Sequence, residues 1–235
     1  MSQSRVLSAG SLAGRTGRGV RIAVIDSGIH PGHPHLGAIA GAVAFDELGI
    51  EDSDVVDRVG HGTAVAAAIH EKAPDAEILS VKIFSRSLTT TGAALGSAFR
   101  WAIDAKADIV NLSLGTTNEE HRAGLEVEVA RAIGGGAIVI SAAPDDRHQW
   151  LPGGIAGVIG VELDWTCPRD ECVLTTLDSG EVRARASGYP RPIPGVPPEH
   201  NIKGQSFAVA NATGLIALAL ETYGSGVRAI LSAPQ

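Results

Sequence analysis

The sequence predicts an α/β fold of three layers, in which helices cover both faces of a mostly parallel sheet. Short apolar runs rich in Val, Ile and Leu alternate with stretches that suit helices, and this alternation implies parallel strands joined by right-handed crossovers. The runs are continuously apolar, as strands covered on both faces are. With 235 residues, 44% of them hydrophobic, the chain can build one large core. We therefore expect a single domain over residues 1–235, with residues 1–20 as an N-terminal extension.

Five apolar, β-branched runs are the expected strands. They cover residues 21–25, 77–83, 107–114, 137–142 and 158–163. Four further stretches are the expected helices, and they cover residues 63–70, 92–106, 121–133 and 206–223. A run of three threonines ends at Thr91, where a hydroxyl can cap the second of these helices.

The segment 172–187 has a different pattern. In it, CVLTTL and EVRARAS are joined by DSG, which predicts a β-hairpin with a tight turn. The Pro-rich stretch 189–198 follows, and we expect a loop there because proline breaks regular structure. The sequence contains no repeat and no interdomain linker.

Charge and hydropathy exclude several classes of partner. The net charge is −7 without any block of Lys or Arg, which disfavours nucleic-acid binding. No segment supplies the roughly 20 apolar residues of a membrane span, and the first residues lack the apolar stretch of a secretory signal. We therefore expect a cytoplasmic protein without a nucleic-acid or membrane partner.

Cys167 and Cys172 are the only cysteines, spaced C-x4-C. A local disulfide is one interpretation in an oxidising compartment, and two free thiols are the expectation in a cytosol. Two cysteines would be half of a zinc site, but no nearby histidine completes it.

Three polar residues stand in contexts that favour catalysis. Asp26 ends the first expected strand, where α/β proteins place their sites, although an Asp can equally cap a turn. A dinucleotide site is disfavoured because the glycines at 14, 17 and 19 precede this strand instead of following it. His61 lies between two glycines at the start of a helix. Ser206 opens an Ala-rich helix, where N-capping is the ordinary role and oxyanion stabilisation is the catalytic one.

The order and surroundings of these residues resemble one known family. Asp, His and Ser follow the chain order of subtilisin. VRIAVIDSGIHPGHPHL, HGTAVA and GQSFA resemble the three catalytic motifs of subtilases, and DIVNLSLG and IVISAAPD resemble their substrate-binding and oxyanion segments. The resemblance extends over residues 21–220 and implies a subtilisin-like fold. It also implies that Ser206 is the nucleophile, His61 the general base and acid, and Asp26 the group that orients His61.

The same resemblance implies where a peptide binds. Ser113, Leu114 and Gly115 would line one wall of the pocket for the residue before the scissile bond. The substrate-binding edges would further include Thr89, Thr90, Thr91, Ala142 and Ala143. An extended peptide would lie between such edges as an added strand.

Asp145 departs from the family pattern, because it stands where subtilases have their oxyanion asparagine. An ionised carboxylate there would repel the oxyanion, and losing the donor reduces the rate by about 10²–10³. Three hypotheses follow. Burial keeps Asp145 protonated as a donor, or Gln205 supplies an amide donor, or the site is weakened or inactive.

Further departures bear on control and specificity. Phe207 and Ala210 replace the family's usual Met and Pro after the nucleophile, which keeps a peptide ligase or cyclase as an alternative. We expect neither a cofactor nor a metal. No acidic loop has the ligand spacing of a calcium site, and we interpret His30, His33 and His35 as solvated loop histidines. We also expect no inhibitory prodomain. The resulting prediction is a serine endopeptidase of narrow specificity, such as one that processes a precursor peptide, with an inactive peptide-binding pseudoprotease as the alternative.

Overall fold

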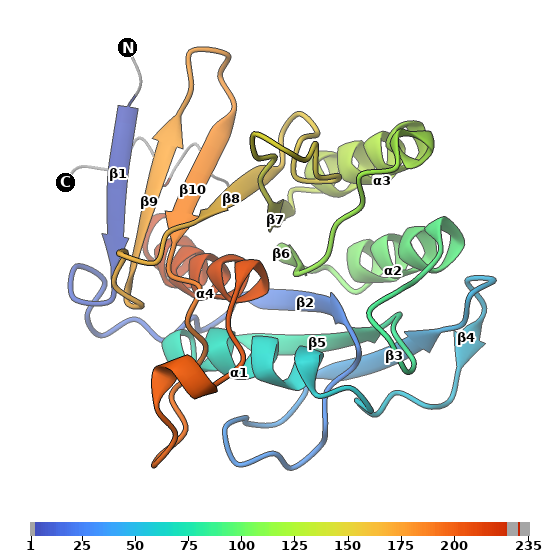
Figure 1. Ribbon diagram of the computed structural model, residues 1–235, viewed down its shortest axis with the longest axis horizontal. Helices are drawn as coiled ribbons and strands as arrows, with labels where there is room; N and C mark the ends of the chain where they lie inside the picture. Colours follow the sequence, from blue (N-terminus) through green and yellow to red (C-terminus); the bar gives the residue numbers. More distant parts are fainter. Residues whose placement is uncertain (1–2, 225–229, 231–235) are drawn as a thin grey trace.

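The computed structural model describes residues 3–224 and residue 230. Within this part of the chain, helices lie on both faces of a ten-stranded sheet (Figure 1). The central strands β10, β8, β7, β6, β2, β5 and β3 run parallel in that spatial order, and antiparallel strands extend both edges. The expected three-layer α/β/α fold with a mostly parallel sheet is therefore confirmed. The strands are β1 (Gln3–Ser8), β2 (Arg21–Asp26), β3 (Gly41–Phe45), β4 (Glu51–Asp52), β5 (Glu77–Lys82), β6 (Ile109–Leu112), β7 (Ile138–Ala142), β8 (Ile159–Leu163), β9 (Glu171–Thr176) and β10 (Val182–Ala186).

The helices divide into two layers, one on each face of the sheet. Helix α4 packs against α1 and against strands β6–β10, whereas α2 and α3 pack against each other over β3, β5 and β7. Alternate residues of β2 follow this division: Ile22 and Val24 belong to the core under α1 and α4, and Ala23 and Ile25 to the core under α2 and α3. The helices are α1 (His61–Lys72), α2 (Gly92–Asp104), α3 (Arg122–Gly134) and α4 (Gln205–Tyr223), with 3₁₀ turns η1 (Glu119–His121) and η2 (Pro198–His200).

The five expected strands and four expected helices are all present, with differences at their ends. The helix expected at 63–70 begins at His61 because Gly60, with φ 88°, adopts the left-handed conformation just before it. The strand expected at 107–114 is confined to Ile109–Leu112, since its pairing with β7 ends at Leu112. Thr91 caps α2 as expected, accepting a hydrogen bond from the N–H of Ala94.

Three strands, β1, β3 and β4, lie outside the sequence expectations. β1 lies in the expected N-terminal extension, where it pairs antiparallel with β9 and buries Leu7. β9 and β10 form the expected hairpin. The Pro-rich stretch is a loop until η2 begins at Pro198.

Cys167 and Cys172 are both free thiols, and complete burial raises the pKa of Cys172 to about 12.

The topology brings the ends of distant segments together at the centre of the sheet. β2 lies between β5 and β6, so the strand order reverses there, and binding sites of open α/β sheets lie at such a reversal. Asp26 is the last residue of β2. In the described part of the chain, no helix combines the length and apolarity needed to cross a bilayer.

Candidate active site

Asp26 and His61 are joined by hydrogen bonds at the end of β2. Nδ1 of His61 lies 2.8 Å from Oδ1 and 2.9 Å from Oδ2 of Asp26. The carboxylate is buried, and the imidazole is exposed over 16% of its side chain. Because the carboxylate accepts the proton on Nδ1, the lone pair of the neutral ring is left on Nε2. The pair therefore presents a base on its solvent side.

Glycine is required where the helix start meets the strand end. A methyl group at Gly62 would stand 2.3 Å from the carbonyl oxygen of Gly28 and 3.1 Å from Cβ of Asp26. Only a residue without a side chain lets α1 approach β2 this closely. The glycine after His61 thus places the imidazole within reach of Asp26.

A second buried carboxylate, Asp57, organises the start of α1. The hydroxyl of Ser27 donates to Asp57 and accepts from the N–H of Gly62. It therefore links Asp57 to the first turn of α1. Burial raises the pKa of Asp57, but hydrogen bonds from Thr63, Gly60 and Val59 outweigh it and hold the pKa below its ordinary value. Sequence reasoning missed this residue, but an Asp just before a helix start is a recognisable capping signal. Asp57 accepts hydrogen bonds from the hydroxyls of Ser27 and Thr63 and from the backbone N–H groups of Val59, Gly60 and Thr63.

The two carboxylates set the pKa of His61. Burial disfavours the imidazolium, but the hydrogen bond and charge of Asp26 and the charge of Asp57 outweigh it, so the pKa of His61 is raised. The ring therefore keeps a proton to a higher pH than an ordinary histidine does.

Ser206 faces the same cavity as His61. The cavity measures about 470 Å³, and its lining includes His61, Leu88, Gln205, Ser206 and Phe207. Ser206 lies in the first turn of α4, whose first N–H groups lack helical acceptors. Its hydroxyl donates to the carbonyl oxygen of Ser113 at 3.1 Å. The serine is thus beside His61 in this cavity, with its hydroxyl turned towards the strand end.

Of the two residues expected at the oxyanion position, Asp145 accepts hydrogen bonds, and Gln205 uses one of its two amide N–H groups within the protein. Asp145 is more than half exposed, and hydrogen bonds from the N–H of Arg147, together with those of His148 and Trp150, lower its pKa. Its exposure and these hydrogen bonds therefore favour the ionised form of Asp145. The amide of Gln205 lines the cavity but donates to the carbonyl oxygen of Val161.

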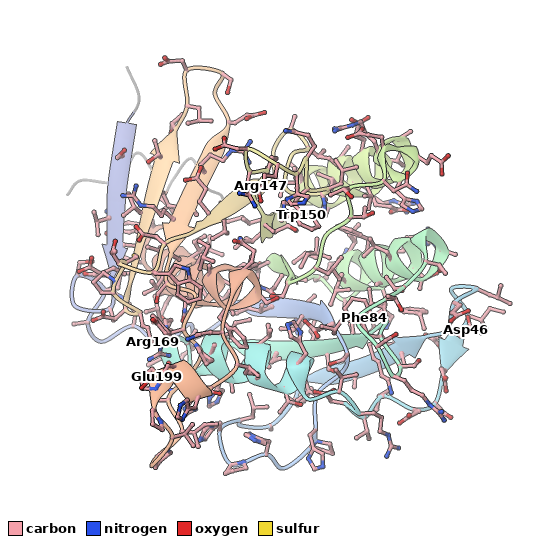
Figure 2. All side chains as sticks on the ribbon, viewed as in Figure 1. Asp46, Phe84, Arg147, Trp150, Arg169 and Glu199 are labelled. Atoms are coloured by element: carbon pink, nitrogen blue, oxygen red, sulfur yellow. The ribbon has the colours of Figure 1, made fainter. Side chains whose placement is uncertain are left out.

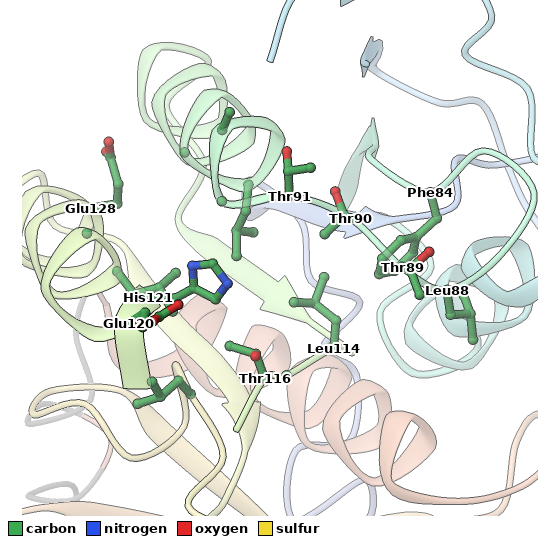
Figure 3. Close-up of a pocket in the computed structure, with 18 of the residues that line it drawn as sticks. Phe84, Leu88, Thr89, Thr90, Thr91, Leu114, Thr116, Glu120, His121 and Glu128 are labelled. Carbon is green, nitrogen blue, oxygen red and sulfur yellow. The ribbon is translucent and has the colours of Figure 1, made fainter. Parts of the chain in front are cut away.

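The expected substrate-binding residues frame a second cavity, of about 540 Å³. Figure 3 shows it with Thr90 and Thr91 on one side, His121 and Glu128 on the other, and Leu114 between them. The lining includes all six expected residues from two segments, which are Thr89, Thr90, Thr91, Ser113, Leu114 and Gly115. Leu88 lines this cavity and also the cavity of Ser206. The two spaces therefore adjoin at Leu88, in the segment between β5 and α2.

Ala142 and Ala143 lie at the end of β7, beside the segment that follows β6. The last pairing between these strands joins Leu112 to Ser141. Both alanines are buried, and the carbonyl of Ala142 lies so close to Gly153 that no side chain fits between them. The two alanines are thus tightly packed beside the segment that follows β6, which is an expected substrate-binding edge.

His30, His33 and His35 line another cavity, of about 620 Å³, together with Arg191; it adjoins the cavity of Ser206 at Val59, Gly60 and Ile202. Burial and the nearby guanidinium lower the pKa of His35. Among residues 3–224 and 230, no group of three or more His, Cys, Asp and Glu side chains is placed to hold a metal ion.

Comparisons with known proteins point to one family. The model of the subtilase family matches residues 17–166. A thermostable alkaline protease of Halalkalibacterium halodurans is 30% identical over 232 residues, which cover 89% of this chain and 59% of that protein. The chain thus spans about three-fifths of the length of this relative.

Solved structures share the fold. A cold-adapted subtilisin-like serine proteinase superposes with a TM-score of 0.71 at 24% identity, covering 93% of this chain and 81% of that one. The prenylagaramide maturation protease PagA superposes with a TM-score of 0.66 at 23% identity, covering 91% and 79%. From the matched family model, together with the fold that carries Asp26, His61 and Ser206, we conclude that this chain belongs to the subtilase family.

Proposed function

We propose that this protein is a serine endopeptidase that hydrolyses peptide bonds through an acyl-enzyme on Ser206. The main support is the His61–Asp26 hydrogen bond at one wall of a cavity that also contains Ser206. A hydroxyl, an imidazole and a carboxylate in this relation are the parts that acyl transfer by serine requires.

The reaction begins with the Ser206 hydroxyl, which must turn from the Ser113 carbonyl to Nε2 of His61. An extended peptide lying along the segment after β6 would bring an N–H to the Ser113 carbonyl and release the hydroxyl. Oγ then attacks the scissile carbonyl carbon while its proton passes to Nε2.

The second half of the reaction reverses these proton movements. The imidazolium, held by Asp26, gives its proton to the departing amine as the peptide C–N bond breaks. Water then attacks the acyl-enzyme, with its proton again passing through His61, and the acid product leaves Ser206 free.

The oxyanion is stabilised in this proposal by the backbone N–H of Ser206 and the N-terminal end of α4. The helix dipole places partial positive charge there. Asp145 accepts hydrogen bonds from its own turn, and one N–H of the Gln205 amide is bonded to the Val161 carbonyl. Oxyanion stabilisation is thus weaker here than with an additional side-chain donor.

The proposed substrate is a peptide or precursor protein cut at few sites. The 540 Å³ cavity beside Ser113 accommodates substrate side chains. One of the proteins that share the fold is named as a maturation protease, in agreement with precursor processing. A cytoplasmic location without nucleic-acid or membrane partners is also part of the proposal, supported by two free thiols and a net charge of −7.

One observation favours a second function, that of a peptide-binding pseudoprotease. The ionised Asp145 opposes the negative charge of a tetrahedral intermediate. A protein of this kind would bind peptides without turnover, and replacing Ser206 by Ala would leave the affinity unchanged.

Hydrolysis of a peptide library separates the two functions. We expect the wild-type protein to release product peptides and Ser206→Ala to lose at least roughly 10³-fold in rate. Ser179→Ala, in the exposed turn of the β9–β10 hairpin, is the control and should retain wild-type turnover. Binding of library peptides with no cleavage by the wild type would support the pseudoprotease instead.

A further inference from the structure

The cavity of Ser206 adjoins two larger cavities. It shares Leu88 with the 540 Å³ cavity, and it shares Val59, Gly60 and Ile202 with the 620 Å³ cavity of the loop histidines. The two larger cavities have no lining residue in common. Since Val59 and Gly60 directly precede the candidate general base in the chain, the 620 Å³ cavity begins beside that base.

The two larger cavities lie on opposite sides of the start of α1. Figure 2 labels a side chain on each side: Phe84, which lines the 540 Å³ cavity, lies to the right, and Glu199, in the loop between β10 and α4, lies to the left. The edges expected to hold the acyl side of a peptide line the 540 Å³ cavity. An extended peptide that passes Ser206 therefore continues, after the scissile bond, towards the 620 Å³ cavity.

Arg191 contributes a cation to the lining of the 620 Å³ cavity. Its Nη1 donates to the carbonyl oxygen of His35 at 2.7 Å, which joins the loop between β10 and α4 to the loop after β2. In the part of the chain that the structure describes, the ion pairs involve other arginines and leave this guanidinium without a carboxylate. Because a guanidinium has five N–H donors, Arg191 keeps donors for a ligand.

The charge of Arg191 acts on two neighbouring imidazoles. Burial and then this guanidinium lower the pKa of His35, and burial and then the same guanidinium lower the pKa of His70. Both shifts have the sign expected next to a positive charge, because a nearby cation disfavours a second one. This wall of the cavity therefore attracts anions.

An imidazole adds a neutral donor to the same lining. The backbone N–H of His35 donates to Nδ1 of His33 at 3.3 Å, so the neutral ring of His33 carries its proton on Nε2. The lining thus combines a guanidinium with an imidazole N–H, and both groups suit a carboxylate ligand.

The other charges of the lining already have partners. Asp57 is the only carboxylate among the described residues that line this cavity. It is buried, and both its oxygens accept hydrogen bonds from the residues around the start of α1. Arg58, the second arginine of the lining, pairs with Asp54. The charge left for a ligand is therefore the positive charge of Arg191.

We propose that the 620 Å³ cavity binds the part of the substrate that follows the scissile bond, and that Arg191 selects an acidic side chain there. The inference rests on the proposed peptidase function and names its substrate class. This class is a peptide with Asp or Glu within about three residues after the cut, a stretch of roughly 10 Å when extended. The carboxylate forms paired hydrogen bonds with the guanidinium.

Matched peptides test this selection. Amidated octapeptides share one acyl side, which is the library sequence that the wild type cleaves fastest or, without cleavage, the one that Ser206→Ala binds most tightly. After the scissile bond they carry Gln at three positions, or Glu at one of the three. We expect kcat/KM of the best Glu peptide to exceed that of the Gln peptide by about 10-fold or more, as for a hydrogen bond to a charged group.

Variants of Arg191 assign this preference to the guanidinium. Arg191→Gln should lower the Glu-to-Gln ratio of kcat/KM to about 1. Arg191→Lys should retain part of it, because lysine keeps the charge but not the paired hydrogen bonds. The matched control is Arg18→Gln, which removes an exposed arginine just before β2, at the opposite end of that strand from Asp26. It should keep the wild-type ratio.

A binding measurement separates this selection from the hydrolysis. In Ser206→Ala, calorimetry compares the same peptides, and we expect the best Glu peptide to bind about 10-fold more tightly than the Gln peptide. That preference without any cleavage by the wild type would retain the acidic-residue site and reject the hydrolysis. Cleavage of all the peptides with equal kcat/KM would reject the site and retain the hydrolysis.

Three further outcomes would also overturn the selection. They are equal affinities or no affinity for the peptides, an unchanged ratio in folded Arg191→Gln, and a preference that appears only when the C-terminal amide is replaced by a free carboxylate. The last outcome would assign the cavity to the end of the peptide chain instead of an acidic side chain.

Discussion

Two buried carboxylates act on one imidazole at the centre of this site. Asp26 bonds directly to His61, and Asp57 raises its pKa through charge while holding the start of α1. In the proposed mechanism the neutral ring accepts the Ser206 proton, so we expect activity to rise as pH increases through the pKa of His61. That rise is displaced to higher pH than for an ordinary histidine.

Asp57→Asn tests the role of the second charge. Removing a negative charge near His61 lowers the pKa of the imidazole, so the acid limb of the kcat/KM profile should move to lower pH. A pH titration of peptide hydrolysis measures it, with exposed Asp52→Asn as the control that leaves the profile in place. An acid limb that stays unmoved in Asp57→Asn would contradict the electrostatic role.

Asp145→Asn tests whether the acid expected at the oxyanion position slows catalysis. Asp145 is ionised, so removing its charge should raise kcat by about 10- to 100-fold. The asparagine oxygen can still accept from the N–H groups of Arg147 and His148, whereas its NH2 group cannot accept the bond from Nε1 of Trp150. Steady-state kinetics on one fluorogenic peptide compares kcat of the variant with kcat of the wild type. A fall in kcat would instead mean that the carboxylate contributes more by anchoring Trp150 than it costs by repulsion.

At the scale of elements, the start of α1 and the end of β2 form one unit. Gly62 allows the close approach, and the hydroxyl of Ser27 bonds both Asp57 and the N–H of Gly62. The position of His61 therefore depends on backbone packing as much as on its own side chain.

Gly62→Ala should disturb this unit. Its methyl group would overlap the Gly28 carbonyl, and we expect a loss of about 2–3 kcal/mol in the free energy of unfolding with slower hydrolysis. Gly134→Ala, in open space at the end of α3, is the matched control. It should stabilise by less than about 1 kcal/mol, as denaturant unfolding would show. Wild-type stability and turnover in Gly62→Ala would argue against the close contact.

The elements around the site were largely predictable, because continuous apolar runs and an Ala-rich final helix have strong patterns. Strands β3 and β4 were not predictable. The β3 segment, GAVAF, is short and begins with glycine, and β4 is a pairing of only two residues at the edge of the sheet. The chain order of Asp26, His61 and Ser206 indicated the site. The packing of Trp150 on Gly115 was not predictable, because it brings together residues 35 positions apart in the chain.

At the scale of the whole molecule, two cores lie on opposite faces of one sheet. β1 joins the sheet at its β9 edge, where Leu7 enters the core under α4 while Val6 on the same strand is 54% exposed. The N-terminal segment is therefore part of the domain and covers an edge that would otherwise have free backbone groups.

Leu7→Ala should destabilise the whole domain by about 2–4 kcal/mol, because it leaves a cavity in a core that spans β1, β9 and α4. Val6→Ala is the matched control on the exposed face and should cost at most about 1 kcal/mol. Thermal unfolding of the two variants gives the comparison. Equal effects would show that β1 is not packed on the domain.

The most direct test of the account is covalent labelling of the intact protein with a fluorophosphonate, followed by peptide mapping. We predict one adduct per chain, on Ser206, forming faster as pH rises through the pKa of His61 and absent in His61→Ala and Ser206→Ala. No adduct on Ser206 anywhere between about pH 5 and 9 would contradict the claim that Asp26, His61 and Ser206 act together.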